Sequence, residues 1–387
     1  MTNMLSPAAP ATRLGTGHAA RAGTLPVLQS AQARWSMPPA RLVLVTHLLD
    51  TAIPFVRLFE RCMDLVRVVP VPYSAQPEAL ARLDDLPITV PESIGEVGAV
   101  AVRDAERAAR ESELPVVIQE VGGYCADAVG RLAQFPNVRG VVEDTKQGQW
   151  RYERNMPLPL PVFTIADSPL KALEDVQVGR SVAYSVERLL RLRFYRLLSE
   201  RRVLVLGYGG IGTALAEHLR RTGAQVAVYD PDEVRMSAAV VHGFRVGARE
   251  DLLGWAEAIV GVSGHRALTV EDLPLLRDGV VLASGSSKQV EFDVEGICRS
   301  ADTLVEADEV MELQVANRTV YLLNHGKPVN FLEQSILGSV LDLVYTELYL
   351  CTRELVGRVW SPGLHRLDPG IQQELAQQWR EEYGRQW

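Results

Sequence analysis

Short apolar runs alternate with amphipathic stretches along most of the chain, beginning at Arg41. A short run rich in Val, Leu and Ile is typical of a strand buried on both faces, whereas a helical repeat of apolar positions is typical of an amphipathic helix. The pattern predicts strands at 42–46, 65–71, 115–119, 138–142, 162–166, 202–206, 224–229, 258–262, 280–284, 303–305 and 320–323, and helices at 98–111, 182–199 and 335–355. Strands and helices in this order form parallel sheets, so the predicted fold class is α/β.

The same pattern divides the chain into two doubly wound domains. Residues 1–39 are rich in Ala, Pro, Thr and Ser and lack the apolar core of a signal peptide, so we expect a flexible arm. Residues 40–165 form a first βαβ domain and residues 201–340 a second one, joined by helices at 166–200. We expect residues 341–387 to be a helix and tail that return to the first domain, completing it, or reach a partner subunit.

A glycine motif follows the strand at 202–206. Gly207, Gly209 and Gly212 have the spacing Gly-x-Gly-x-x-Gly, and a helical pattern follows at once. In that context the first glycine permits a tight turn, the second lets the backbone approach a pyrophosphate, and the third lets helix and strand pack closely. The amide groups at the start of the helix, which include those of Gly210 and Ile211, favour a bound phosphate. The motif therefore predicts a Rossmann dinucleotide-binding domain.

An acidic residue ends the next strand of this domain. Asp230 lies 23 residues after Gly207. At that distance a carboxylate accepts hydrogen bonds from the ribose hydroxyls of NAD and repels the 2′-phosphate of NADP. NAD is therefore the predicted cofactor.

Composition and charge narrow the classes of partner. The net charge of −8 argues against nucleic acid and against an anionic membrane surface. No apolar run is long enough to span a bilayer. The four cysteines are scattered, which favours buried thiols in the cytoplasm over disulfides or a zinc site, and no cluster has metal-ligand spacing. We expect a cytoplasmic protein that acts on a small molecule.

Four segments in a fixed order carry a resemblance to a known family. They are Glu143-Asp144-Thr145, then Asp167-Ser-x-x-Lys171-x-x-x-Asp175, then the glycine motif, then Gly326-x-x-Val-Asn330. From about Leu42 to about Leu350 this arrangement resembles S-adenosylhomocysteine hydrolase. The resemblance implies an enzyme that keeps NAD bound and oxidises the 3′-hydroxyl of a nucleoside sugar. The ketone then allows β-elimination of the 5′ substituent, water adds, and the hydride returns.

The resemblance also implies roles for individual residues. Lys171 takes the proton of the 3′-hydroxyl, and Asp175 is its carboxylate partner on the sugar. Lying at i and i+4, the two side chains are expected on one helix face. The other implied contacts are Asp144 with the sugar, Asp50 with the purine, Thr145 and Gly285 with the cofactor, and Asn330 with the nicotinamide.

The first domain departs from the family pattern where elimination takes place. Thr46 and Val121 stand where the family has a histidine and an aspartate, although His47 and Glu120 are each one residue away. We therefore treat His47 and Glu120 as candidate site residues. His325, in a tight turn before Asn330, is a further candidate proton donor near the nicotinamide. The family's adenine-covering loop after Val-Asn and its C-terminal lysine and tyrosine are missing.

Three functions fit this pattern of retained cofactor motif and altered substrate residues. The first is a specialised nucleoside hydrolase or dehydratase, in which a thiol or water leaves. The second is a plain NAD-dependent dehydrogenase that releases NADH. The third is a catalytically inactive NAD-binding regulator. In each case we expect a homodimer or homotetramer, as the family and the apolar helix at 335–355 suggest.

Overall fold

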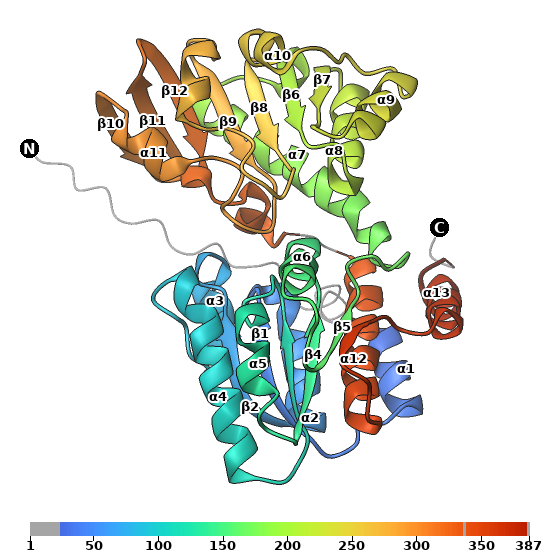
Figure 1. Ribbon diagram of the computed structural model, residues 1–387. Coiled ribbons are helices and arrows are strands. Elements are labelled where there is room, and N and C mark those ends of the chain that lie inside the picture. The colour runs from blue at the N-terminus through green and yellow to red at the C-terminus, as the bar shows by residue number, and fades with distance from the viewer. Residues whose placement is uncertain (1–23, 336–337, 385–387) are drawn as a thin grey trace, which may run out of the picture.

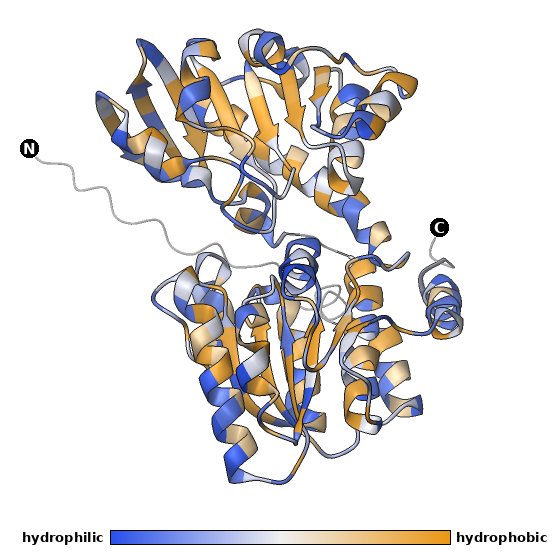
Figure 2. Cartoon of the chain, viewed as in Figure 1, coloured by the Kyte–Doolittle hydropathy of each residue, from blue (hydrophilic) through white to orange (hydrophobic). Residues whose placement is uncertain are grey.

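Two α/β domains, each built on its own sheet, form two lobes that meet along one face (Figure 1). The computed structural model describes residues 24–335 and 338–384. Each sheet is an apolar layer between helices, which is visible as mostly orange strands inside both lobes (Figure 2). The predicted fold class is therefore confirmed.

The first sheet is parallel throughout and has the order β13-β5-β4-β3-β1-β2. Its strands are β1 (Arg41–Thr46), β2 (Asp64–Pro70), β3 (Val116–Glu120), β4 (Val138–Glu143), β5 (Pro161–Thr164) and β13 (Gly363–His365). Alternate residues of β1 enter two separate cores: Leu42 and Leu44 on one face, Val43 and Val45 on the other. A strand buried on both faces has the continuous apolar sequence from which it was predicted.

Helices cover both faces of this sheet (Figure 1). One face packs against α2 (Ile53–Cys62) and α12 (Val340–Gly357), and the other against α4 (Val97–Glu111). The smaller helices of this lobe are α3 (Pro77–Ala81), α5 (Val129–Leu132) and α6 (Lys146–Arg154). Because α12 follows the second domain in sequence and packs here, the expected return of the chain to the first domain is confirmed.

The second sheet has the order β10-β11-β12-β9-β8-β6-β7. Its strands are β6 (Arg202–Leu206), β7 (Gln225–Tyr229), β8 (Ala258–Gly261), β9 (Val280–Ser284), β10 (Thr303–Ala307), β11 (Val310–Val315) and β12 (Arg318–Leu323). Its helices are α7 (Ala172–Phe194), α8 (Gly210–Arg221), α9 (Glu233–Val241), α10 (Arg249–Trp255) and α11 (Val294–Arg299). The β10–β11–β12 meander is antiparallel, and the other neighbouring strands are parallel.

The segment predicted as a loose arm is partly helical, which corrects the prediction over 24–39. Helix α1 (Pro26–Arg34) buries Val27, Leu28 and Ala31 against the first domain. No side chain of its own caps its start. Instead, the carboxylate of Asp342 in α12 accepts hydrogen bonds from Val27 N at 2.8 Å and Leu28 N at 2.9 Å. Residues 1–23 of the predicted arm lie outside the described residues.

The C-terminal tail forms helix α13 (Pro369–Tyr383) beside α12. Trp379 Nε1 donates to Ser339 O at 2.8 Å, and Tyr383 OH donates to Asp342 at 2.9 Å. Asp342 thus joins both terminal helices to α12. In the described part of the chain, no helix is long and apolar enough to cross a membrane.

Candidate active site

The two sheets turn their carboxyl edges toward each other, as contacts between the loops that follow the strands show. Gln76 Nε2 donates to Phe331 O at 3.3 Å, and the ring of Trp150 stacks on that of His265 at 4.6 Å. Loops at the carboxyl ends of parallel strands are where α/β sheets bind their ligands. The candidate site is therefore the region between the two edges.

The predicted glycine turn joins β6 to α8. Gly207 has a φ of +103° and lies so close to Ser263 that a side chain would collide with its backbone. A side chain at Gly212 would collide with the carbonyl of Gly207. Gly209, at the N-cap of α8, has open space in front of it. The first and third glycines therefore shape the turn, while the second leaves room for a phosphate at the helix N-terminus.

Asp230 lies beside this turn at the end of β7. Its carboxylate accepts hydrogen bonds from Tyr208 N at 2.7 Å and Asp232 N at 2.9 Å, and it pairs with Arg235 at 3.3 Å. The side chain is nearly buried. These contacts hold a negative charge next to the turn, where an adenosine ribose of NAD would lie.

The far end of the cofactor region contains two buried polar atoms that have no hydrogen-bond partner in the described structure. They are Asn330 Oδ1 and Ser284 Oγ. Unsatisfied buried polar groups are rare and indicate a missing ligand or water. Gly285 packs so tightly against Val182 and Val262 that no side chain fits. The amide oxygen of Asn330 lacks a hydrogen-bond donor, and the carboxamide of a nicotinamide has N–H groups that can donate to it. The residues present therefore fit NAD.

A lysine and two carboxylates meet at the carboxyl edge of the first sheet. Lys171 precedes α7, and its Nζ lies 2.7 Å from Asp144 Oδ1, just after β4. The same Nζ pairs with Glu174. Burial alone would lower the pKa of Lys171, but the two carboxylates raise it well above its ordinary value. Lys171 is therefore an ammonium group in the ligand-free protein.

Within α7 the carboxylate paired with Lys171 is Glu174, which was not predicted, rather than Asp175. Lys171 is the N-cap residue of α7, so its side chain reaches the residue three positions on. Asp175 turns toward the second domain instead, where a side chain on Gly210 would collide with its carboxylate. Asp175 therefore lies against the glycine turn.

His47 lies at the end of β1 and faces the second domain. Its ring is 4.5 Å from that of Phe331, and Nδ1 is 2.7 Å from Ser74 Oγ. Burial, together with the charges of Lys288 and Lys171, lowers the pKa of His47 to about 3. His47 is therefore neutral at physiological pH, and one of its ring nitrogens carries no proton.

Glu120 is directed into the first domain rather than toward the second. It accepts hydrogen bonds from Cys125 N and from Tyr152 OH and is fully buried. Next to it, Glu143 accepts bonds from the backbone amides of Gly122 and Gly123, each at 2.8 Å. Burial raises the pKa of both carboxyls, and repulsion from Glu120 contributes to raising that of Glu143 to about 8. In this structure the pair supports the loop after β3, a role that differs from the predicted substrate contact of Glu120.

Three other predicted residues have partners of their own. Thr145 caps α6 by accepting a bond from Gly148 N at 3.1 Å, and it donates to Glu143. Asp50 lies near the inter-domain face, where its backbone amide donates to Gln334 Oε1 at 2.9 Å. The ring of His325 is 2.9 Å from Asp308 O, which lies in the β10–β11 turn. The structure thus does not bring His325 to His47 or Lys171.

Lys288 is a site residue that the sequence analysis missed. It lies in the loop between β9 and α11, yet its Nζ donates to Gly122 O of the first domain and lies 4.5 Å from the centre of the Tyr124 ring. The side chain is buried. The signal that could have found it is the rarity of lysine, since the chain has only four among its 40 basic residues.

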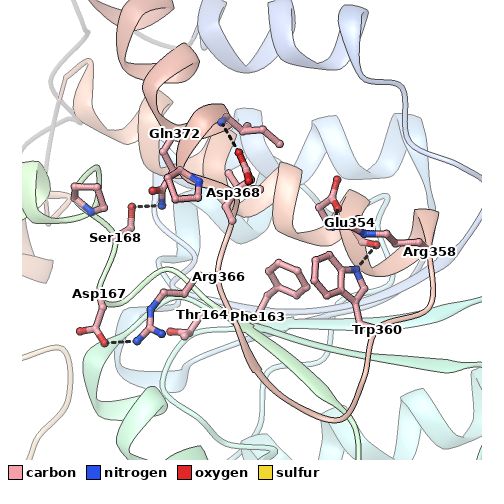
Figure 3. A pocket seen from close by; sticks show the side chains of 14 residues that line it. Phe163, Thr164, Asp167, Ser168, Glu354, Arg358, Trp360, Arg366, Asp368 and Gln372 are labelled. Atoms are coloured by element: carbon pink, nitrogen blue, oxygen red, sulfur yellow. Dashed lines mark hydrogen bonds and ion pairs between the residues drawn. The ribbon is translucent and has the colours of Figure 1, made fainter.

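A pocket of about 650 Å³ is lined by Asp175 and Gly210, among other residues of α7 and α8. A separate pocket, of about 590 Å³, lies between the β5–α7 turn and the segment before α13 (Figure 3). Its charged groups face one another: Arg366 pairs with Asp167 at 2.8 Å, and Arg358 with Glu354 at 2.9 Å. Gln372 donates to Ser168 Oγ at 3.2 Å. These pairs join the tail to the first domain, and the pocket contains no predicted site residue.

Comparisons with known proteins support the same assignment. Residues 186–335 match the family model "S-adenosyl-L-homocysteine hydrolase, NAD binding domain". The adenosylhomocysteinase of Archaeoglobus fulgidus is 34% identical over 200 residues, which is 50% of this chain and 48% of that protein. The S-inosyl-L-homocysteine hydrolase of Methanosarcina acetivorans is 28% identical, covering 64% and 61%. The adenosylhomocysteinase of a Nostoc species is 25% identical, covering 91% and 86%.

The fold and the glycine turn define a two-domain NAD-binding protein. The matched NAD-binding domain and these relatives support a member of the adenosylhomocysteinase family. The alignments span about half to two thirds of the first two relatives, so their activities do not transfer directly. NAD is the cofactor of the matched domain.

Proposed function

We propose that this protein is a specialised nucleoside hydrolase or dehydratase that keeps NAD bound through its cycle. The observation that carries this proposal is the cluster of Lys171, Asp144 and Glu174, which lies at the sheet edge facing the NAD domain. When bound, NAD would supply a reversible oxidation of one sugar hydroxyl carbon. Everything else in the cycle is proton transfer and positioning, which the side chains of this chain must perform.

The cluster is suited to taking a proton from a sugar hydroxyl. The cluster of one ammonium and two carboxylates has a net charge of −1. One of the carboxylates can therefore accept a proton. Lys171 can release a proton to Asp144 or Glu174 while its nitrogen takes the proton of the hydroxyl. Burial already raises the pKa of Glu174, which favours its accepting that proton. The cluster thus acts as a base although the pKa of Lys171 alone is too high for one.

A ketone in the sugar makes the neighbouring C–H acidic, so a modest base can remove that proton and the substituent on the next carbon can leave. His47 is neutral and faces the second domain, which suits it to this step. The family's histidine and aspartate at this place are Thr46 and Val121 here. The family's adenine-covering loop is also missing. In its place, η8 (Val329–Glu333) packs directly against α7. These replacements favour a substrate other than S-adenosylhomocysteine.

The first test is the absorbance and denaturing mass spectrum of the purified protein. The proposal predicts co-purified NAD, which becomes NADH when one member of a panel of purine nucleosides, including adenosine, S-adenosylhomocysteine and hexulosyl purines, is added. The NADH must stay bound. Free NADH that accumulates with turnover would instead identify a plain dehydrogenase. If no nucleoside reduces the bound NAD, the proposal fails and the inactive regulator is favoured.

A further inference from the structure

Lys288 crosses from the NAD domain into the first domain without forming an ion pair. Among the described residues, its Nζ donates to the carbonyl of Gly122 and lies against the Tyr124 ring, and no carboxylate is within ion-pair distance. An ammonium group has three donors, so it retains capacity for a ligand. A neighbouring contact, from Tyr73 OH to Ser287 O, fixes the loop that carries it.

The use of lysine in this chain is selective. The sequence contains 36 arginines and four lysines: Lys146, Lys171, Lys288 and Lys327. Lys146 and Lys327 are exposed, whereas Lys171 and Lys288 are largely or fully enclosed between the domains. Arginine does not lose its proton in proteins, whereas a buried lysine can. Most cations of this chain are arginines, and its two interior lysines both lie at the candidate site. These two positions therefore have a cation that can lose its proton.

Both lysines lie close enough to His47 for their charges to act on its ring, and both contribute to lowering its pKa. Lys171 is held at the end of β4 by Asp144, and Lys288 at the end of β3 by Gly122. Neighbouring parallel strands are about 4.8 Å apart, which is the scale of a single sugar ring. One sugar can therefore contact Lys171 at one carbon and Lys288 near the next.

We propose that Lys288 is the acid–base residue for the group that leaves the sugar, an inference that rests on the proposed function. His47 removes the proton next to the ketone, and the electron pair forms the C=C bond as the bond to the leaving thiol or hydroxyl breaks. The ammonium of Lys288 gives that group its proton. Where water then adds, neutral Lys288 takes a proton from the water as its oxygen bonds to carbon, and His47 returns the first proton to the carbon it came from.

The surroundings of Lys288 suit a group that gains and loses a proton near neutral pH. Burial and the charges of Arg151 and Arg154 lower its pKa, and Glu143 and Glu120 raise it, giving about 8. The neutral ring of His47 and the phenols of Tyr124 and Tyr73 are further titratable groups near it. The leaving-group step is therefore expected to slow as the pH rises above about 8, because the ammonium donor is lost.

The test uses the full-length holoenzyme with isotope-labelled lysine, whose four side-chain NMR signals can be assigned by replacing each lysine with arginine. The probes are adenosine, S-adenosylhomocysteine and hexulosyl purines, each added separately. We expect one of them to shift the signals of Lys171 and Lys288 and to leave those of Lys146 and Lys327 unchanged. A shift of Lys171 without Lys288 overturns this inference and leaves the proposed function intact. If neither signal shifts with any of the probes, both fail.

Single-turnover kinetics of Lys288→Met and Lys288→Arg then separate proton transfer from a structural role. With the nucleoside that reduces the bound NAD, both variants should still form bound NADH. Release of the leaving group should fall about 100-fold or more, the usual contribution of general acid catalysis. Lys327→Met, on the surface, is the matched control. Normal release in Lys288→Arg would overturn the inference, because arginine keeps the charge but cannot deliver the proton.

Discussion

Lys171 Nζ lies 2.7 Å from Asp144 Oδ1, so the residue that begins α7 is tied to the end of β4. Neither residue is exposed, and the contact lies at the edge of the first sheet that faces the NAD domain. Both residues belong to segments that resemble the family motif. Among the described residues, the only other carboxylate paired with Lys171 is that of Glu174, in the first turn of α7.

Replacing Lys171 with methionine should abolish the first proton transfer, because the cluster would lose the nitrogen that receives the hydroxyl proton. We expect formation of bound NADH from the active nucleoside to slow by about 10²- to 10⁴-fold. The NAD content should be unchanged, since Lys171 is outside the glycine turn. Stopped-flow absorbance measures the rate, with Lys327→Met as the control. A normal rate in Lys171→Met would exclude the cluster as the base.

Asp230→Asn should weaken NAD binding and reduce the preference for NAD over NADP. A charged hydrogen-bond acceptor contributes about 1.5–3 kcal/mol, which corresponds to roughly a 10- to 150-fold rise in Kd. Titration calorimetry of the NAD-free protein with each cofactor measures this, and Glu233→Gln, at an exposed position of α9, is the control. An unchanged ratio of the two affinities would show that Asp230 serves only to hold Tyr208 and Arg235.

Stability should fall as the pH rises from about 5 to 8, because of the Glu120–Glu143 pair. The folded-state pKa of Glu143 is raised to about 8, whereas an unfolded glutamate has a pKa of about 4.3. Between these values the folded protein binds more protons than the unfolded chain, so raising the pH favours unfolding.

Glu120→Gln tests this dependence, because it removes the repulsion and keeps an oxygen for Cys125 N and Tyr152. We expect the loss of unfolding free energy across this pH range to shrink by about 1–3 kcal/mol in urea titrations. Glu111→Gln, on the surface, should leave the pH dependence as it is in the parent protein. An equally steep fall in Glu120→Gln would contradict the account of the pair.

Asp342→Ala should detach both terminal helices from α12. The change leaves the amides of Val27 and Leu28 and the hydroxyl of Tyr383 without their acceptor, at a cost of about 1–3 kcal/mol for each buried group. We expect a total loss of about 3 kcal/mol in urea unfolding and faster proteolysis near residues 26–34. The exposed Glu382→Ala is the control, and equal stability of the two variants would refute this role.

The sequence predicted most of the sheet strands because buried parallel strands have continuous apolar sequences. It missed β11, in the antiparallel meander, and β13, which has three residues. More than one helix was predicted over 166–200, with one of them beginning at 182, whereas α7 is continuous over Ala172–Phe194. The loop after β3 was not predicted either: Gly122 and Gly123 both have positive φ, and their amides donate to Glu143. Positive φ prevents a right-handed helix at that point.

Site residues were predicted where the signal is local and missed where it is long-range. The glycine turn and Asp230 lie on consecutive elements with fixed spacing. Lys288 has no periodic context, and its partner Gly122 is 166 residues away. Glu174 was missed because its pairing depends on α7 beginning one residue after Lys171. Pairing of this kind follows from the packing of the two domains, which no local pattern encodes.

The most direct test of the central claim follows one hydrogen atom through the cycle. The active nucleoside is prepared with deuterium on the carbon that bears the oxidised hydroxyl, and the product is analysed by mass spectrometry. An enzyme that keeps NAD bound and returns the hydride should give a product that retains the deuterium on that carbon, with no free deuterated NADH. Deuterium recovered in free NADH, or a product that has lost it to solvent, would contradict the account.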